Sequence, residues 1–226
     1  MKRLLKNKYI IASFLCIIIY TLYLKMMEIY PFGEYSILKS DMYQQYINFF
    51  CYLREVILHG KSIAISWNLG LANNFFTTYA YYLMSPINLL VVFFNPTNMD
   101  LFVELITGIK IILMANFMVL FLEKSYNYKS NETIIFGLIY VFSSYVICYS
   151  FHIMWLDCVY MLPIVLLFVD KFLENEKILP LVLSLSYSIL TNYYIGYIVA
   201  FFAGIYFLAR YYITQKNSTW MDFFKC

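Results

Sequence analysis

Residues Pro31 to Pro86 read PFGEYSILKSDMYQQYINFFCYLREVILHGKSIAISWNLGLANNFFTTYAYYLMSP. The stretch lies between hydrophobic segments, yet it is rich in Asp, Gln, Asn, Ser and Tyr. A lipid-facing segment could carry these groups only at a large desolvation cost. We therefore expect the stretch to lie outside the hydrocarbon core and to hold the chemistry of the chain.

Part of this stretch, residues 40–59, has the pattern of an amphipathic helix. Its apolar side chains recur at helical spacing and are Met42, Tyr46, Phe49, Phe50, Leu53, Val56 and Ile57. The opposite side holds Asp41, Gln44, Gln45, Asn48 and Glu55. Because hydrophobic segments tether the helix at both ends, we predict that it lies along the membrane surface with Asp41 near its N-terminus.

The composition of the whole chain is that of a membrane protein. The 226 residues are 63% hydrophobic and 13% charged, a balance that does not suit the surface of a water-soluble domain. The net charge of +3 comes from basic residues that flank the hydrophobic segments and form no basic patch, so we expect no nucleic-acid partner. The predicted fold class is an all-α polytopic membrane protein in contact with the lipid bilayer.

The hydrophobic segments predict about six transmembrane helices in a single membrane domain, residues 1–226. These segments are residues 9–24, 101–122, 133–150, 158–173, 178–191 and 197–212. Four basic residues precede the first segment, and further basic residues fall in alternate connections. This asymmetry predicts that both termini are cytoplasmic and that residues 28–100 form a long extracytoplasmic loop. Within the loop, residues 87–94 are too few to span a membrane, which favours an interfacial or re-entrant helix.

The same topology brings two further polar segments to the outer face, residues 151–157 and 192–196. Two carboxylates, Asp41 and Asp157, would meet there beside His152, and could supply a general base and ligands for a divalent cation such as Mg²⁺ or Mn²⁺. For Asp41 there is also a structural alternative, because an Asp followed three residues later by Gln44 is typical of a helix N-cap.

The remaining candidates also have structural alternatives. His152 is compatible with a hydrogen-bonded interfacial histidine, and Trp155 with an aromatic belt at the membrane surface. The Asn192-Tyr193-Tyr194 tripeptide could end a helix or offer an amide and two phenols to a ligand. Lys110 lies in the middle of a predicted span, where its ammonium needs an acidic partner or a wet cavity unless it reaches an interface along its stem.

Short motifs in the same order along the chain resemble the bacterial YfhO family. They are Pro31-Phe32-Gly33, Asp41 with Gln44-Gln45-Tyr46 and Phe49, Asn68-Leu69-Gly70, Tyr81 to Asn88 (YYLMSPIN), Trp155-Leu156-Asp157 and Asn192 to Tyr197 (NYYIGY). The resemblance implies a membrane glycosyltransferase of the GT-C type in the bacterial cell membrane. Such an enzyme takes a sugar from a polyprenyl-phosphate carrier and attaches it to a cell-envelope acceptor such as teichoic acid. It also implies that Asp41 is the essential acidic residue at the start of a surface helix.

Members of the family are several times longer than this chain. We therefore expect residues 1–226 to be the N-terminal part of a longer architecture, which a second polypeptide would complete. In the leading hypothesis Asp41 is the base or a metal-linked carboxylate and Asp157 supports it. Substrate contacts are expected from Gln44, Gln45, Tyr46, Asn68, Asn88, Lys110, His152, Trp155, Asn192, Tyr193 and Tyr194. The alternatives are a non-catalytic transporter or flippase of lipid-linked sugars and an inactive truncated fragment.

Overall fold

The computed structural model describes residues 7–67, 74–174 and 177–214. In these ranges the chain is helical, and an isolated bridge between Ile29 and Tyr35 is the one β-type pairing. The helices are α1 (Lys8–Met26), η2 (Met42–Tyr46), α2 (Ile47–His59), α3 (Phe75–Thr78), η3 (Tyr79–Leu83), η4 (Pro86–Phe93), η5 (Pro96–Asn98), α4 (Met99–Ser125), α5 (Glu132–Val141), α6 (Ser144–Tyr149), α7 (Ile153–Leu173), α8 (Leu179–Thr191) and α9 (Tyr193–Thr214). The predicted all-α polytopic membrane fold is confirmed.

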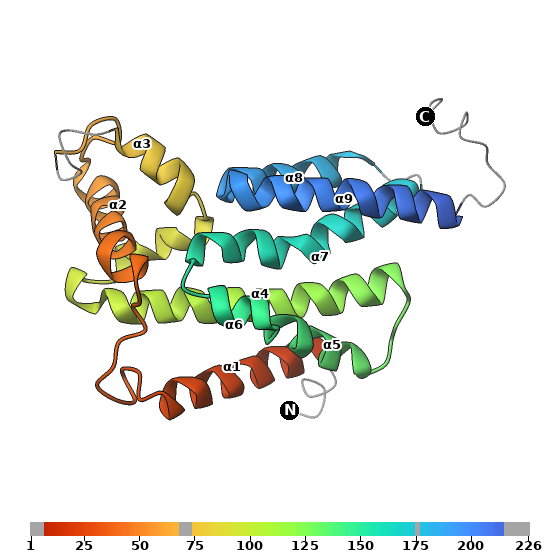
Figure 1. Cartoon of the computed structure of the whole chain (residues 1–226), viewed down its shortest axis with the longest axis horizontal. Coiled ribbons are helices and arrows are strands. Elements are labelled where there is room, and N and C mark those ends of the chain that lie inside the picture. Colours follow the sequence, from red (N-terminus) through yellow and green to blue (C-terminus); the bar gives the residue numbers. More distant parts are fainter. Residues whose placement is uncertain (1–6, 68–73, 175–176, 215–226) are drawn as a thin grey trace.

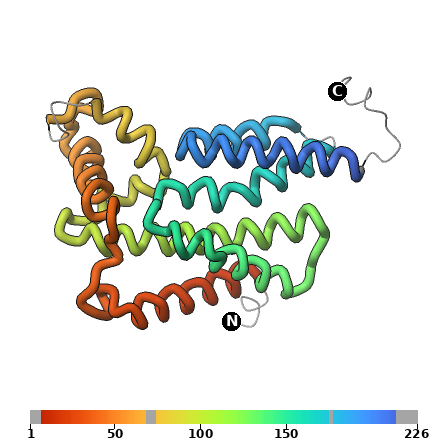
Figure 2. Tube along the Cα trace, in the orientation of Figure 1, coloured from red at the N-terminus to blue at the C-terminus, as the bar shows by residue number. Residues whose placement is uncertain are grey.

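The long helices form an antiparallel bundle with α4 in its middle (Figure 1). Helix α4 packs against α1, α5 and α7, and α7 packs against α8 and α9. The end of α1, the start of α4 and the α6–α7 and α8–α9 connections all lie at one end of the bundle, as the tube in Figure 2 shows. Helices α2 and α3 lie at the same end, which we call the loop end. The polar segments that the sequence placed together therefore share one end of the molecule.

Five helical stretches of the described chain are long and apolar enough to cross a membrane. They are Lys8–Met26, Pro96–Ser125, Glu132–Tyr149, Ile153–Leu173 and Tyr193–Ile213. Residues 178–191, predicted as a span, form α8, whose 13 residues extend about 20 Å against a hydrocarbon core of about 30 Å. A sixth candidate comes from the loop, where Phe75–Leu83 and Pro86–Phe93 meet at an angle of 107°. The chain bends at Ser85 because the residue before a proline is disfavoured in the α conformation.

The predicted amphipathic helix is present as η2 followed by α2, and it ends at Gly60, whose φ of 64° is left-handed. Its buried side is close to the predicted one, with Met42, Tyr46, Phe50 and Leu53 all buried. Ile57, predicted on that side, is exposed instead. The helix packs on η4, which follows the sharp bend. The loop is therefore held against the bundle by an apolar core of its own.

The opposite end of the bundle is held together by charge. The Lys8 ammonium lies 2.5 Å from the Glu123 carboxylate, which links the start of α1 to the end of α4. Arg210 of α9 pairs at 2.6 Å with Asp170 of α7, and the Tyr206 hydroxyl donates to the same carboxylate. This end of the bundle is therefore held by ion pairs, whereas the loop end is held by apolar packing.

Candidate functional site

Aromatic and polar side chains from four segments meet at the loop end. The Tyr46 hydroxyl of η2 lies 3.4 Å from Nδ1 of His152, which immediately precedes α7. The Tyr82 hydroxyl of η3 donates to the Gln45 amide oxygen at 3.4 Å, and the Tyr46 and Tyr82 rings lie 5.3 Å apart. Residues far apart in the sequence, three of them predicted (Gln45, Tyr46 and His152), therefore share one site.

Asp41 borders this cluster with its carboxylate free. Its own backbone is already helical, and its side chain makes no cap hydrogen bond. The first amide groups of the helix instead donate to the backbone carbonyls of Lys39 and Ser40. The N-cap alternative is therefore wrong, because the turn satisfies those amides without the carboxylate. Asp41 is half-buried, and within the described chain it has no hydrogen-bond or ion-pair partner.

The charge of Asp41 acts on its neighbours. Burial lowers the pKa of His152 below its usual 6.5, and the Asp41 carboxylate opposes that shift. Burial raises the pKa of Tyr46, and Asp41 adds to that increase. At neutral pH the site therefore combines a carboxylate, a neutral imidazole and neutral phenols. This set can accept a proton at one place and hydrogen-bond hydroxyl groups at several others.

Aromatic faces extend the site across the loop end. The Trp155 ring lies 4.1 Å from that of His152 and 6.4 Å from that of Tyr194. Tyr193 lies 5.4 Å from Tyr81, centroid to centroid. Tyr193 and Tyr194 are 62% and 54% exposed, so both are accessible to a ligand.

Asp157 does not join Asp41 at this surface. It is fully buried, and its Oδ2 lies 2.5 Å from the Lys110 ammonium. Its Oδ1 accepts from the hydroxyls of Ser85, at 2.5 Å, and Tyr160, at 2.9 Å. The expectation of two neighbouring surface carboxylates is corrected, because α7 begins at Ile153 and carries Asp157 into the bundle.

Lys110 is satisfied by the same network. Its ammonium also donates to the Ile153 carbonyl at 2.9 Å, and the side chain is fully buried. A mid-span lysine beside an acidic group is what its position predicted. The contacts make the pair a link between α4 and α7, and through Ser85 a link to the bend of the loop.

The described residues give little support to the expected divalent-cation site at Asp41 and Asp157. Among the described residues, no three or more His, Cys, Asp or Glu side chains come together as a possible metal site. Asp157 is occupied by Lys110, Ser85 and Tyr160, so it cannot share a cation with Asp41. A single carboxylate at Asp41 fits Mg²⁺ only where substrate phosphates complete the coordination.

Asn192 has a structural role in this molecule. Its side-chain oxygen accepts from the Ile195 amide at 3.0 Å, so it caps α9, and its Nδ2 lies 3.4 Å from the Tyr81 carbonyl. Asn88 is also buried, and its side-chain oxygen has no partner in the described chain. Gln44 is exposed at the surface of the helix. Asn68 lies outside the described residues.

Several residues of the site and its support escaped the sequence reasoning. Ser85 and Tyr160 hold Asp157, and the Tyr160 hydroxyl also bonds that of Tyr187 in α8. A polar run inside an apolar segment, Ser184 to Ser188, was the available signal for Tyr187. Tyr81 and Tyr82 were quoted only as part of a motif, although Tyr82 contacts both Tyr46 and Phe49.

A comparison with protein families identifies a match for most of the chain. The model of a family described as bacterial membrane protein YfhO matches residues 12–226. The chain belongs to the YfhO family. Neither the curated proteins nor the solved structures that were compared give a match. Membership in the YfhO family and the apolar helices together make this a multi-pass membrane protein in contact with the lipid bilayer.

Proposed function

We propose that this YfhO-family chain contributes the catalytic face of a membrane glycosyltransferase, with Asp41 as the general base. The donor is a sugar on a polyprenyl-phosphate carrier, and the acceptor is a hydroxyl of a cell-envelope polymer such as teichoic acid. The observation that carries the proposal is the free carboxylate of Asp41. It sits at the start of a surface helix and beside phenols, an imidazole and exposed aromatic faces, and it performs no capping role.

In the proposed reaction the acceptor hydroxyl attacks the anomeric carbon of the donor sugar. A carbon–oxygen bond forms to the acceptor while the bond between the anomeric carbon and the phosphate oxygen breaks. The hydroxyl proton moves to Asp41, and the electron pair of the broken bond leaves with the carrier phosphate. Gln45 and Tyr82 are placed to hydrogen-bond sugar hydroxyls, and Trp155 and Tyr193 to stack on the sugar ring.

The proposal includes a location and a partner. The loop end faces outward and both chain termini face the cytoplasm, as the distribution of basic residues favours. A second polypeptide takes part in the complete enzyme. A divalent cation, Mg²⁺ or Mn²⁺, takes part only if the donor phosphate provides most of its ligands.

A second candidate function, transport or flipping of a lipid-linked sugar, has one observation in its favour. A buried Lys110–Asp157 pair between two candidate spans is the kind of charge that marks ion pathways in transporters. Here, however, the pair is closed by Ser85 and Tyr160 and is fully buried. The free carboxylate at Asp41 therefore favours catalysis over transport.

The test replaces Asp41 by Asn and by Ala in cells that carry the complete system. Because the carboxylate caps no helix, we expect both variants to express and insert as the wild type does. Both should leave the envelope acceptor without its sugar, as measured by mass spectrometry of that acceptor at matched expression. Glu34→Gln, which removes an exposed carboxylate from the same segment, is the control and should keep activity. Full glycosylation in the Asp41→Asn variant would exclude the proposed base.

A further inference from the structure

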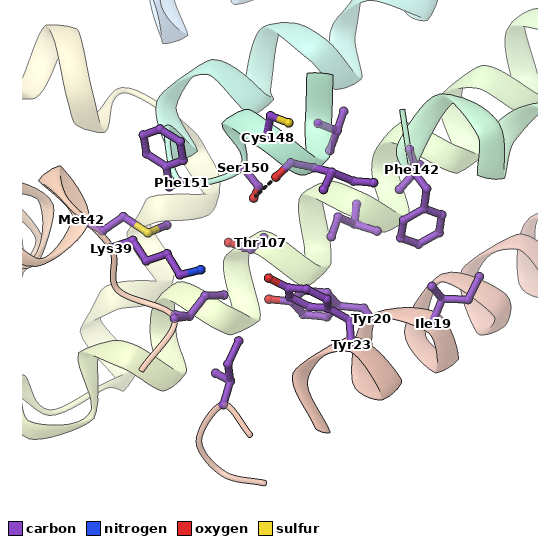
Figure 3. Close-up of a pocket in the computed structure, with 16 residues that line it drawn as sticks. Ile19, Tyr20, Tyr23, Lys39, Met42, Thr107, Phe142, Cys148, Ser150 and Phe151 are labelled. Carbon is purple, nitrogen blue, oxygen red and sulfur yellow. Dashed lines mark hydrogen bonds between the residues drawn. The ribbon is translucent and has the colours of Figure 1, made fainter. Parts of the chain in front are cut away.

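A cavity of about 420 Å³ lies beside the Asp41 site, between the end of α1, the chain before η2, α4 and α6 (Figure 3). Its volume is within the range of about 300–1,000 Å³ that is usual for small-ligand sites. Most of the lining is aliphatic or aromatic, with Ile19, Ile111, Val146, Phe142 and Phe151 among the wall residues. Such walls suit a hydrocarbon chain.

Two polar groups, the Lys39 ammonium and the Thr107 hydroxyl, make one part of the cavity polar. Lys39 is the one charged residue among those that line it, and within the described chain its ammonium has no carboxylate partner. Thr107 is only 2% exposed, and among the described residues its hydroxyl has no hydrogen-bond partner. Figure 3 shows the Lys39 amine and the Thr107 hydroxyl turned toward the same part of the cavity, with the hydroxyls of Tyr20 and Tyr23 nearby. A buried hydroxyl without a partner costs about 1–3 kcal/mol, which a ligand oxygen would recover.

The cavity is open at its side. Two of the lining residues, Tyr23 of α1 and Ile147 of α6, are 40% and 60% exposed. Both belong to stretches that are apolar and long enough to cross a membrane, Lys8–Met26 and Glu132–Tyr149. In a bilayer this opening between α1 and α6 would face lipid. A chain could therefore enter from the membrane, with its polar end near Lys39 at the loop end.

We infer that this cavity binds the phosphate-proximal part of an isoprenyl phosphate. The apolar walls would hold the first isoprene units, Lys39 would pair with the phosphate, and Thr107 would hydrogen-bond one of its oxygens. Met42, which lines the cavity, directly follows Asp41, so a phosphate at Lys39 would place an attached sugar toward the Asp41 side. The inference rests on the proposed function for the identity of the lipid, while the pocket itself specifies an apolar chain with an anionic head.

Cys148 provides a direct probe of occupancy, because it is exposed and lines the cavity. The full chain carrying Cys51→Ser and Cys226→Ser would be purified in detergent and treated with N-ethylmaleimide. Geranylgeranyl phosphate should slow the alkylation of Cys148, at a concentration at least tenfold lower than geranylgeraniol requires. The inference would be overturned if geranylgeraniol or an oleoyl lysophosphatidate protected Cys148 as well as geranylgeranyl phosphate does. It would also be overturned if geranylgeranyl phosphate gave no protection.

Variants then separate the parts of the site. Lys39→Gln should weaken protection by geranylgeranyl phosphate at least tenfold and leave protection by the alcohol unchanged. Lys25→Gln, an exposed lysine of α1 outside the cavity, is the matched control and should bind as the wild type does. Thr107→Val should weaken binding severalfold. Ile147→Trp, which places an indole at the exposed mouth without a change in the core, should abolish protection by both lipids.

The outcomes distinguish this inference from the proposed function. Binding that survives in every variant would exclude the cavity, whether or not Asp41 is catalytic. Normal lipid binding together with full glycosylation in the Asp41→Asn variant would exclude the base and leave the lipid site in place.

Discussion

At the scale of single residues, the Lys110–Asp157 pair predicts that replacing one partner destabilises the protein far more than replacing both. Removal of one partner leaves a buried charge without compensation, so Lys110→Met or Asp157→Leu alone should lower the free energy of unfolding by about 3–5 kcal/mol. The double variant should recover most of that loss, because two apolar side chains replace the whole pair. Thermal unfolding of the four proteins in one detergent measures the cycle.

The Lys61–Glu55 pair in the loop serves as the control for this cycle. The two groups lie 3.1 Å apart but are 47% and 30% exposed, so Lys61→Met should cost less than about 1 kcal/mol. If Lys110→Met were equally harmless, the ion pair would not hold α4 to α7.

His152 predicts a pH effect. Its pKa in the folded protein lies below the usual 6.5 because burial disfavours the imidazolium. The unfolded chain then binds more protons near pH 6, so the stability contributed by neutral His152 is complete above about pH 6.5 and declines as the pH falls toward the folded pKa. His152→Gln should reduce this decline in thermal unfolding.

The pKa itself can be measured, because the chain has two histidines. With His59→Gln, the remaining ¹⁵N-histidine signal reports His152 alone and should titrate below pH 6.5. Asp41→Asn removes the charge that opposes the shift, so the pKa of His152 should fall further. An unchanged pKa in that variant would show that Asp41 does not act on the imidazole.

The sequence located Asp41 and its helix correctly but not the environment of Asp157. Polar residues between apolar segments suffice to identify a surface helix, since the cost of burying them is local. Lys110, the partner of Asp157, lies 47 residues away in the chain, and no local sequence pattern predicts such a contact. The cavity beside Lys39 was missed for the same reason, because its walls come from four separate segments.

At the scale of helices, the contact between α8 and α9 predicts a size limit at Gly196. A Cβ atom there would lie 2.6 Å from the Ser188 carbonyl oxygen and 2.7 Å from the Ile189 Cα. Both are backbone atoms, so the helices must separate, and Gly196→Ala should destabilise the protein by about 1–3 kcal/mol. Thermal unfolding at matched detergent concentration measures the change.

Gly204 provides the control within the same helix. A Cβ atom at Gly204 has nothing within 4 Å, so Gly204→Ala should be neutral or slightly stabilising, since alanine favours a helix over glycine. Equal effects of the two substitutions would show that the close α8–α9 contact is absent in solution.

The hydrophobic runs predicted where the helices lie, but they did not predict all of the helix ends. Residues 101–122 were predicted as a helix that extends from Met99 to Ser125, and residues 158–173 as one that begins at Ile153. Polar residues at a helix start look like a loop in the sequence, because only packing shows that they are buried. The predicted span at residues 178–191 forms the short helix α8, which packs against α7 and α9.

At the scale of the whole molecule, the shared end of α2, α3 and the α6–α7 and α8–α9 connections predicts one orientation in the membrane. The loop end should face outward if the basic termini remain inside. In a background that carries Cys51→Ser, Cys148→Ser and Cys226→Ser, a cysteine at Ala64, which is exposed, should react with an impermeant thiol reagent in intact cells. A cysteine at Lys129, exposed at the other end, should react only after the cells are opened. The reverse pattern would place Asp41 in the cytoplasm.

The buried pair between α4 and α7 also constrains how the protein is made. The ribosome releases Lys110 well before Asp157, because 47 positions separate them. During that interval α4 reaches the insertion machinery with an unpaired ammonium, which insertion scales value at about 3 kcal/mol against entry into lipid. Helix α4 should therefore wait beside the translocon until α7 arrives, so that the two helices partition into the bilayer together.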